Sequence, residues 1–284
     1  MALLLACVST LFFGAALITG KVALRTLDAR SGAAISLPTG AVLFLIAAPF
    51  VLDLSGYVAR AALLFALVGT FFPAAVTIIT FESNQRLGPT LTGTISSTAP
   101  LFALVAAALL LGEHIPAKAA IASVGIVAGV ALLTWKAAGA RTAALSWSLG
   151  LPILGAVLRG LAHAVARAGL LLWPNPFAAG LIGYVVSSTA VLAVDRMPRA
   201  NRMRRNKRAV AWFVLTGVIN SAALLLMYAA LARAPVAFVA PIVAAYPLVT
   251  VILSATVLRE ETFSVRKIVG AVLTVASIVY LVIR

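Results

Sequence analysis

Three ionisable side chains recur at four-residue intervals inside one otherwise apolar stretch, residues 149–169. They are Arg159, His163 and Arg167, and this spacing places all three on one face of a helix. A guanidinium can bind an anionic or carboxylate-bearing ligand, and an imidazole can exchange a proton near neutral pH. Arg159 and His163 are therefore candidate substrate-binding and proton-relay residues. The alternatives are a structural ion pair or a tie to neighbouring carbonyls for Arg159, and a hydrogen bond between helices for His163.

The composition around these side chains is that of a membrane protein. Of the 284 residues, 63% are hydrophobic and 10% are charged, with a mean hydropathy of +1.13, whereas soluble domains carry about 25% charged residues. An arginine at the centre of a spanning helix costs about 2.5–3.5 kcal/mol. Arg159 must therefore face a cavity or a partner instead of lipid. Arg167 lies near the end of its run, where we expect it to extend toward the membrane interface.

The composition also disfavours several classes of function. The net charge of +15 comes mostly from residues between the apolar runs, where basic side chains orient a membrane protein, so nucleic acid is not an expected partner. The single cysteine, Cys7, cannot form an intrachain disulfide, and without a Cys/His cluster we expect no metal or other cofactor. The seven acidic residues are scattered over connections, so no catalytic constellation is visible.

Ten continuous apolar runs predict an all-α protein with ten transmembrane helices, because a helix needs about 20 mostly apolar residues to cross a bilayer. The first run lacks a preceding basic region, which indicates a mature span and not a signal peptide. No run alternates as a membrane strand would. The predicted helices are 2–23, 33–52, 61–81, 89–111, 118–136, 148–170, 176–195, 209–231, 235–258 and 265–283. Their short connections, which make neighbouring helices antiparallel, include 53–60, ESNQRLG (82–88), 112–117 and 259–264.

One unit of the chain occurs twice. Residues 81–113 and 227–261 share a polar break, a proline, an apolar run with a second proline, and then a glutamate. The pairs that match across 146 to 148 residues are Pro89 and Pro235, Pro100 and Pro247, and Glu113 and Glu261. Further matches are Phe13-Gly14 with Arg159-Gly160, Lys21 with Arg167, and Gly69 with Gly217. We interpret the chain as two five-helix repeats, 1–136 and 148–284, joined by a linker, 137–147.

Five helices per repeat make the second repeat enter the membrane from the opposite side to the first. Such inverted-topology repeats are typical of secondary transporters, whose substrate site lies near the midplane between the repeats. The matched prolines, which remove helix hydrogen bonds and permit kinks, suit a gating or hinge role, with plain packing geometry as the alternative. The matched glutamates have a local interpretation, because negative charge favours a helix N-terminus; gating or coupling is the alternative.

The basic residues are divided unequally between the two sides of the membrane. Loops after odd-numbered helices and the adjoining helix ends contain 16 Lys and Arg, seven of them within 196–208, and the other side contains four. The positive-inside rule therefore places the odd loops in the cytoplasm and both termini outside.

The order and duplication of these motifs resemble the EamA repeat of the drug/metabolite transporter superfamily. The resemblance rests on Tyr-x-Ala-Leu-x-x-Ala-Pro (228–235), the proline helices, the glutamates and the glycines after them. Of the family's two glycines after each glutamate, the first copy keeps Gly129 and has Ala122, and the second keeps Gly270 and has Ser277. The resemblance implies a ten-helix transporter of small organic metabolites in the plasma membrane, the inner membrane of a bacterium. It also implies that both termini are cytoplasmic, which conflicts with the charge distribution.

Further site candidates come from comparing the copies. Arg159 takes the place of Phe13, which sits at the family's aromatic cavity-facing position, and Glu82 takes the place of Tyr228. If the third helix extends to residue 84, Glu82 could face Arg159 or a bound amine. If the helix stops at Phe81, Glu82 is interfacial. The weaker candidates, which could serve only as interhelical hydrogen bonds, are Asn220, Tyr246, Thr94 and Thr98.

These observations predict a secondary active transporter that works by alternating access on a small organic metabolite. Arg159 favours an anionic or zwitterionic substrate, such as an amino acid, and His163 suggests a coupling proton. No nucleotide-binding motif is present, so a gradient, exchange or passive flow must drive transport. The expected partners are the substrate and the bilayer, and the expected assembly is a monomer or homodimer. The alternative is an integral membrane enzyme or a structural membrane protein without transport activity.

Overall fold

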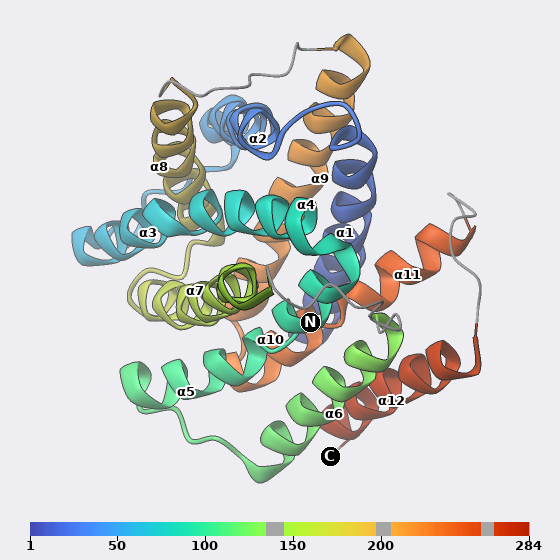
Figure 1. Ribbon diagram of the computed structural model, residues 1–284. Coiled ribbons are helices and arrows are strands. Elements are labelled where there is room, and N and C mark those ends of the chain that lie inside the picture. Colours follow the sequence, from blue (N-terminus) through green and yellow to red (C-terminus); the bar gives the residue numbers. More distant parts are fainter. Residues whose placement is uncertain (135–144, 197–205, 257–263, 284) are drawn as a thin grey trace. The chain divides into compact units, whose positions relative to one another are not determined.

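The computed structural model describes residues 1–134, 145–196, 206–256 and 264–283, and every regular element in these ranges is an α-helix (Figure 1). The long apolar runs of the sequence form helices because a helix satisfies its own backbone hydrogen bonds inside lipid. The helices are α1 (Ala2–Ala23), α2 (Ala29–Val51), α3 (Ala59–Phe71), α4 (Ala74–Ser96), α5 (Ala99–Leu111), α6 (Ala117–Thr134), α7 (Leu145–Leu172), α8 (Pro176–Arg196), α9 (Lys207–Leu231), α10 (Val236–Val243), α11 (Tyr246–Thr256) and α12 (Val265–Val282).

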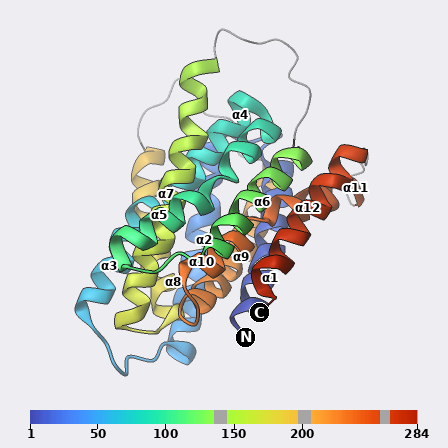
Figure 2. The same cartoon turned by 90° about the horizontal axis from the view of Figure 1, so that it is seen from below.

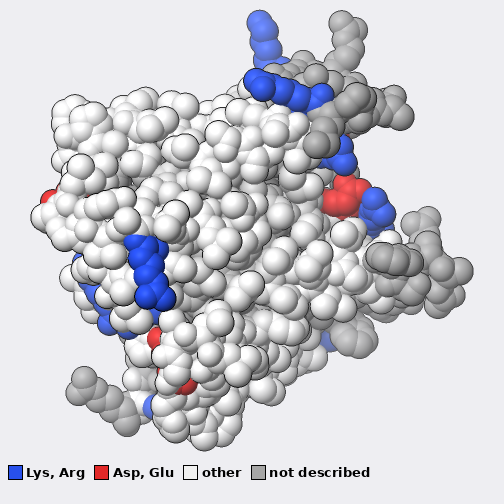
Figure 3. All heavy atoms as spheres, turned by 90° about the vertical axis from the view of Figure 1, so that its left-hand side faces the viewer, with Lys and Arg blue, Asp and Glu red and all other residues white. Residues whose placement is uncertain are grey.

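Eight segments of the described chain are long and apolar enough to cross a membrane. Two shorter apolar helices, Ala99–Leu111 and Ala117–Leu133, accompany them. On the face shown in Figure 3, most of the described surface is uncharged. The chain is therefore a multi-pass helical membrane protein. The predicted number of ten spans depends on the two shorter helices and stays a prediction.

The predicted boundaries of the third and fourth helices were wrong. ESNQRLG (82–88) was expected to be a connection, but these residues belong to α4, where Arg86 and Glu82 form an i, i+4 ion pair. The helix ends earlier, at Phe71, because Pro73 has no N–H and the preceding Phe72 is extended, with φ −132° and ψ 123°. A polar sequence inside a transmembrane stretch is not by itself a helix end.

Two further breaks occur at matching places in the two repeats. Ser97 and Thr98 separate α4 from α5, and Ala244 and Ala245 separate α10 from α11. Pro100 and Pro247 are the second residues of the helices that follow. A proline is tolerated at the start of a helix, where its missing N–H would have no intrahelical partner. The predicted helices 89–111 and 235–258 are therefore each discontinuous.

The helices form two compact units, and each unit takes helices from both halves of the sequence. Unit 1 comprises Met1–Ile78 and Val165–Ala234, and unit 2 comprises Ile79–Ala164 and Pro235–Arg284. The chain passes between the units within α4, within α7 and immediately before Pro235. Figure 2 shows the same helices from a second direction.

In unit 1, α1 and α9 lie side by side and antiparallel. The hydroxyl of Ser9 donates to the carbonyl of Ala223 at 2.8 Å. The hydroxyls of Thr19 and Thr216 lie 2.8 Å apart nearer the other ends of the helices. These bonds satisfy buried side chains where lipid could not.

Glycines allow the other helices of unit 1 to approach closely. A Cβ on Gly217 of α9 would lie 2.3 Å from the carbonyl oxygen of Ser36 in α2. On α3, a Cβ at Gly69 would lie 2.9 Å from the carbonyl oxygen of Gly183 in α8. The Ser187 hydroxyl of α8 donates to the Gly69 carbonyl at 2.6 Å. Small residues at such interfaces are typical of helix association in membranes.

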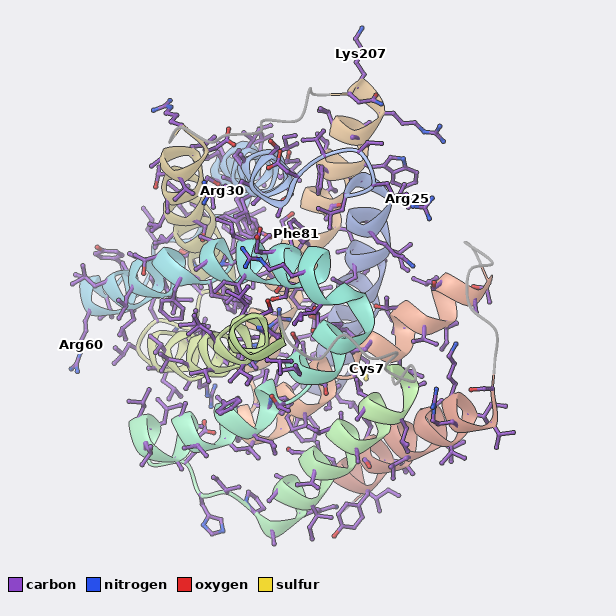
Figure 4. All side chains as sticks on the ribbon, in the orientation of Figure 1. Cys7, Arg25, Arg30, Arg60, Phe81 and Lys207 are labelled. Carbon is purple, nitrogen blue, oxygen red and sulfur yellow. The ribbon has the colours of Figure 1, made fainter. Side chains whose placement is uncertain are left out.

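One end of unit 1 is basic. The start of α2 meets the start of α9, because Gly32 contacts Phe213, and the end of α1 lies beside them. The basic residues at this end are Lys21, Arg25, Arg30, Arg196, Lys207 and Arg208. Arg60 and Arg233 lie at the opposite end, and Figure 4 shows Lys207 and Arg60 extending outward from their helices.

The opposite end of unit 1 is closed by contacts between two loops. The Trp173 indole N–H donates to the Ser55 carbonyl at 3.2 Å, and the Asn175 amide donates to the Asp53 carbonyl at 2.6 Å. The Ser55 hydroxyl and N–H both donate to the Asp53 carboxylate, at 2.6 and 2.8 Å, which lowers the pKa of this exposed carboxyl.

In unit 2, glycines allow the backbones of α6 and α12 to approach closely. A Cβ on Gly129 would lie 2.8 Å from both the Gly270 carbonyl oxygen and the Thr274 amide nitrogen. A Cβ on Gly270 would in turn lie 2.7 Å from the Gly129 carbonyl oxygen. α10 packs against α5 and α6 in the same unit.

The basic end of unit 1 predicts its orientation. In a Cys7→Ala background, Lys207→Cys should react with a membrane-impermeant maleimide only from the cytoplasmic side, because basic loops are retained there. Ala59→Cys, at the other end, should react only from outside. Labelling intact cells and inverted vesicles measures both, and the reverse pattern would contradict the charge-based orientation.

The glycine contact between α6 and α12 predicts a sharp positional effect. Gly129→Ala should destabilise the protein by about 1–3 kcal/mol, because backbone atoms of α12 occupy the space of the added methyl. Gly150→Ala in α7 is the matched control, since nothing lies within 4 Å of a Cβ there. Thermal unfolding in detergent compares the two, and equal effects would show that the close approach is not limiting.

Candidate functional site

Arg159 is held by an aromatic partner in unit 2. Its Nη1 donates to the Tyr246 hydroxyl at 3.3 Å, and its guanidinium carbon lies 5.5 Å from the centre of the Tyr246 ring. A cation over an aromatic face gains about 0.5–2 kcal/mol, more when water is excluded. The Arg159 Nε is buried and has no hydrogen-bond partner among the described residues. Tyr246 therefore supports the guanidinium without using all of its donors.

The surrounding backbone positions both side chains. Gly160 lets α7 approach α5, because a Cβ there would lie 2.6 Å from the Ala103 amide nitrogen and 2.7 Å from the Phe102 Cβ. Tyr246 is the first residue of α11, directly after the helix break, and is 6% exposed. Ala245 in the break belongs to a buried apolar cluster with Ile126 and Val130 of α6. The break and the glycine thus place the two partners together.

The predicted basic face of α7 is divided between the two units. His163 follows Arg159 by one helical turn in unit 2 and is only 5% exposed. Arg167 belongs to unit 1, where its guanidinium donates to the carbonyl of Leu231, the last residue of α9. Arg167 therefore binds a helix terminus, whose carbonyls carry partial negative charge.

Unit 1 contains a second polar cluster, built from neutral groups. The Asn220 amide donates to the Tyr184 hydroxyl at 3.4 Å, and Tyr184 is fully buried. Tyr228, two turns beyond Asn220 on α9, is 2% exposed. Tyr184 was not among the predicted residues. Its signal was a single tyrosine among small and apolar residues of α8, with Gly40 of α2 making room for its ring.

The other predicted residues are not brought to Arg159 by any described contact. Glu82 lies within α4, which extends past residue 84, but its carboxylate accepts hydrogen bonds from the Arg86 guanidinium at 2.7 and 2.9 Å. The Thr98 hydroxyl donates to the Ile95 carbonyl at 2.7 Å within the break. Phe13 is half-buried in α1 of unit 1. Thr94 and Pro89 fall within α4, but their side chains are outside the described part, as is all of Glu261.

Glu113 has a partner that sequence reasoning missed. Its Oε2 accepts a hydrogen bond from the backbone N–H of Val236, the first residue of α10, at 3.0 Å. Pro235, the residue at the N-cap of that helix, supplies no side-chain bond. The charge of Glu113 thus favours a helix N-terminus, as expected for these glutamates, but the helix belongs to the other repeat. No local pattern relates two residues 123 positions apart.

The described residues bring together no group of three or more His, Cys, Asp or Glu side chains of the kind that holds a metal ion. What the geometry offers is a partly buried guanidinium on an aromatic ring in unit 2, and a neutral hydroxyl–amide cluster in unit 1. Such groups bind and orient polar molecules through hydrogen bonds and charge.

Apolar helices that satisfy their own backbone hydrogen bonds in lipid define a multi-pass helical membrane protein. Residues 1–135 and 142–283 each match the model of the EamA-like transporter family, so the chain belongs to that family. Among solved structures, a crystal structure of a protein superposes on this chain with a TM-score of 0.76 at 15% sequence identity. The match covers 99% of this chain and 96% of the other, which shows a shared fold. No curated protein sequence matches the chain.

Proposed function

We propose that this protein is a secondary active transporter that moves a small organic metabolite across a bacterial inner membrane by alternating access. The substrate is anionic or zwitterionic, such as an amino acid. Membership of a transporter family supports transport in general, and the polar groups in the helices support the choice of substrate.

A single observation carries the choice of substrate: Arg159 has no carboxylate partner within the described part of the chain. Its polar contacts there are the ring and hydroxyl of Tyr246, and its Nε has no acceptor. A guanidinium presents five N–H donors in a fork that suits a carboxylate. An anionic substrate group would supply the missing charge and acceptors.

The contacts inside the units support two inverted repeats of five spanning helices. Gly69 joins α3 to α8, and Gly217, its repeat counterpart, joins α9 to α2. The two contacts are equivalent, because α3 and α8 in the first contact correspond to α9 and α2 in the second when the two repeats are exchanged. The family model also matches each half of the chain separately. In such architectures the site lies between the repeats and gating moves one set of helices against another.

Arg159 variants test the anion hypothesis. Arg159→Ala should lower uptake of anionic or zwitterionic substrates by at least about tenfold, since a hydrogen-bonded charge contributes about 1.5–3 kcal/mol. Arg159→Lys should retain part of the activity, because it keeps the charge without the fork. Proteoliposomes and a labelled panel of amino acids, carboxylates and phosphorylated metabolites provide the measurement.

The matched control for these variants is Arg60→Ala, which removes an exposed arginine at the start of α3. It should transport like the wild type. Unchanged uptake of every substrate by Arg159→Ala would refute the anion hypothesis.

His163 is proposed to carry a coupling proton, because it is the titratable side chain one turn from Arg159 on α7. His163→Gln should abolish accumulation driven by a pH gradient and preserve exchange of substrate across the membrane. Both modes can be measured in the same proteoliposomes. Intact pH-driven accumulation in this variant would exclude the role.

A further inference from the structure

The contact between Glu113 and α10 joins the two repeats at a helix start. The chain enters α10 from Pro235, which has no side-chain acceptor and no N–H, so the first turn of α10 lacks a cap of its own. The Val236 N–H would then remain unpaired in an apolar environment. Instead it donates to the Glu113 carboxylate at 3.0 Å, and the negative charge also suits the positive end of the helix.

The end of α5 holds Glu113 in place. Gly112 is left-handed, with φ 63° and ψ 19°, and its N–H bonds back to α5 carbonyls. The Glu113 N–H bonds to the Ala107 carbonyl at 3.3 Å. This turn needs a glycine because side chains rarely adopt a positive φ. The sequence Leu111-Gly112-Glu113 therefore ends one helix and presents the carboxylate to another.

α10 transmits this restraint to Tyr246. Seven of its eight residues are buried, and it packs on α5 and α6. Backbone bonds continue through the break, from Ala244 N–H to the Ala240 carbonyl at 3.0 Å and from Leu248 N–H to the Ala245 carbonyl at 2.9 Å. Ala245 packs in one buried apolar cluster with the α6 residues Ile126 and Val130. We therefore expect a shift at the start of α10 to displace Tyr246, the first residue of α11.

α5 consequently contacts the two helices that lead to the Arg159–Tyr246 pair: α7, which carries Arg159, and α10, which precedes Tyr246. It meets α7 at Gly160, the neighbour of Arg159, and it meets α10 through Glu113. We propose that Glu113 is a positioning residue of the transport site: its carboxylate fixes the first turn of α10 and so sets Tyr246 beside Arg159. The proposal rests on the proposed function for its importance in transport, whereas the mechanical link stands on unit 2 alone.

Hydrogen exchange of the full chain in lipid nanodiscs tests the link. Glu113→Ala should speed amide exchange about fivefold, the loss expected for a missing cap, over residues 236–248, including Tyr246. Glu113→Gln, which keeps an acceptor, should change exchange less. His114→Ala is the matched control, because His114 is the exposed neighbour of Glu113. Faster exchange confined to residues 236–239, or none, would overturn the proposal.

A double-mutant cycle on thermal unfolding gives a second readout that needs no substrate. Tyr246→Phe removes the hydroxyl bonded to Arg159 and should lower the melting temperature in the wild type. In the Glu113→Ala background the same change should have a smaller effect, because coupled contacts are not additive. Additive shifts would refute the positioning role. If exchange and coupling are as expected but Arg159→Ala transports normally, the substrate hypothesis fails and the link between Glu113 and Tyr246 remains.

Discussion

The arrangement of unit 2 depends on keeping a guanidinium inside an apolar helix. Lipid cannot solvate Arg159, so the fold must supply partners, and it supplies the face and hydroxyl of one tyrosine. The tyrosine must then be delivered to the right depth by a helix that starts there. The break before α11 and the close approach at Gly160 both serve this placement. A net positive charge remains after these contacts, and the proposed anion recognition rests on that charge.

Glycines and prolines have different roles in the packing and the boundaries of the helices. Glycines bring backbones together, as at the α6–α12 contact and the α9–α2 contact, where another residue type would collide with backbone atoms. Prolines mark where helices start, as at Pro100 and Pro247. Because matched positions in the two repeats carry these residues, similar contacts recur between different helices. The copies differ at other matched positions, such as Arg159 in place of Phe13, so the same scaffold carries different side chains in its two halves.

Much of the helical content was predictable from sequence, because continuous apolar runs have one stable form in lipid. The boundaries around residues 71–98 were not, since a polar stretch was taken for a loop although its Glu and Arg favour a helix and pair within it. Arg159 was identifiable from its cost in the membrane, but its partner Tyr246 was only one of several weak candidates. Glu113 was expected at a helix N-terminus, yet which helix it caps depends on tertiary packing that no local pattern encodes. The contacts of Tyr184 with Asn220 and Gly40 likewise depend on tertiary packing.

The exchange of helices between the halves has a consequence for biosynthesis. α1 packs against α9, and α6 packs against α12, so helices inserted early lack their final contacts until the later helices are synthesised. At about 5–20 residues per second, roughly ten to forty seconds separate the emergence of α1 from that of α9. During that interval Ser9 and Thr19 lack their partners on α9, and the early helices stay in the bilayer through their own hydrophobicity. Unit 1 gains its last helix with α9 and unit 2 with α12, so the two units mature one after the other as the ribosome advances.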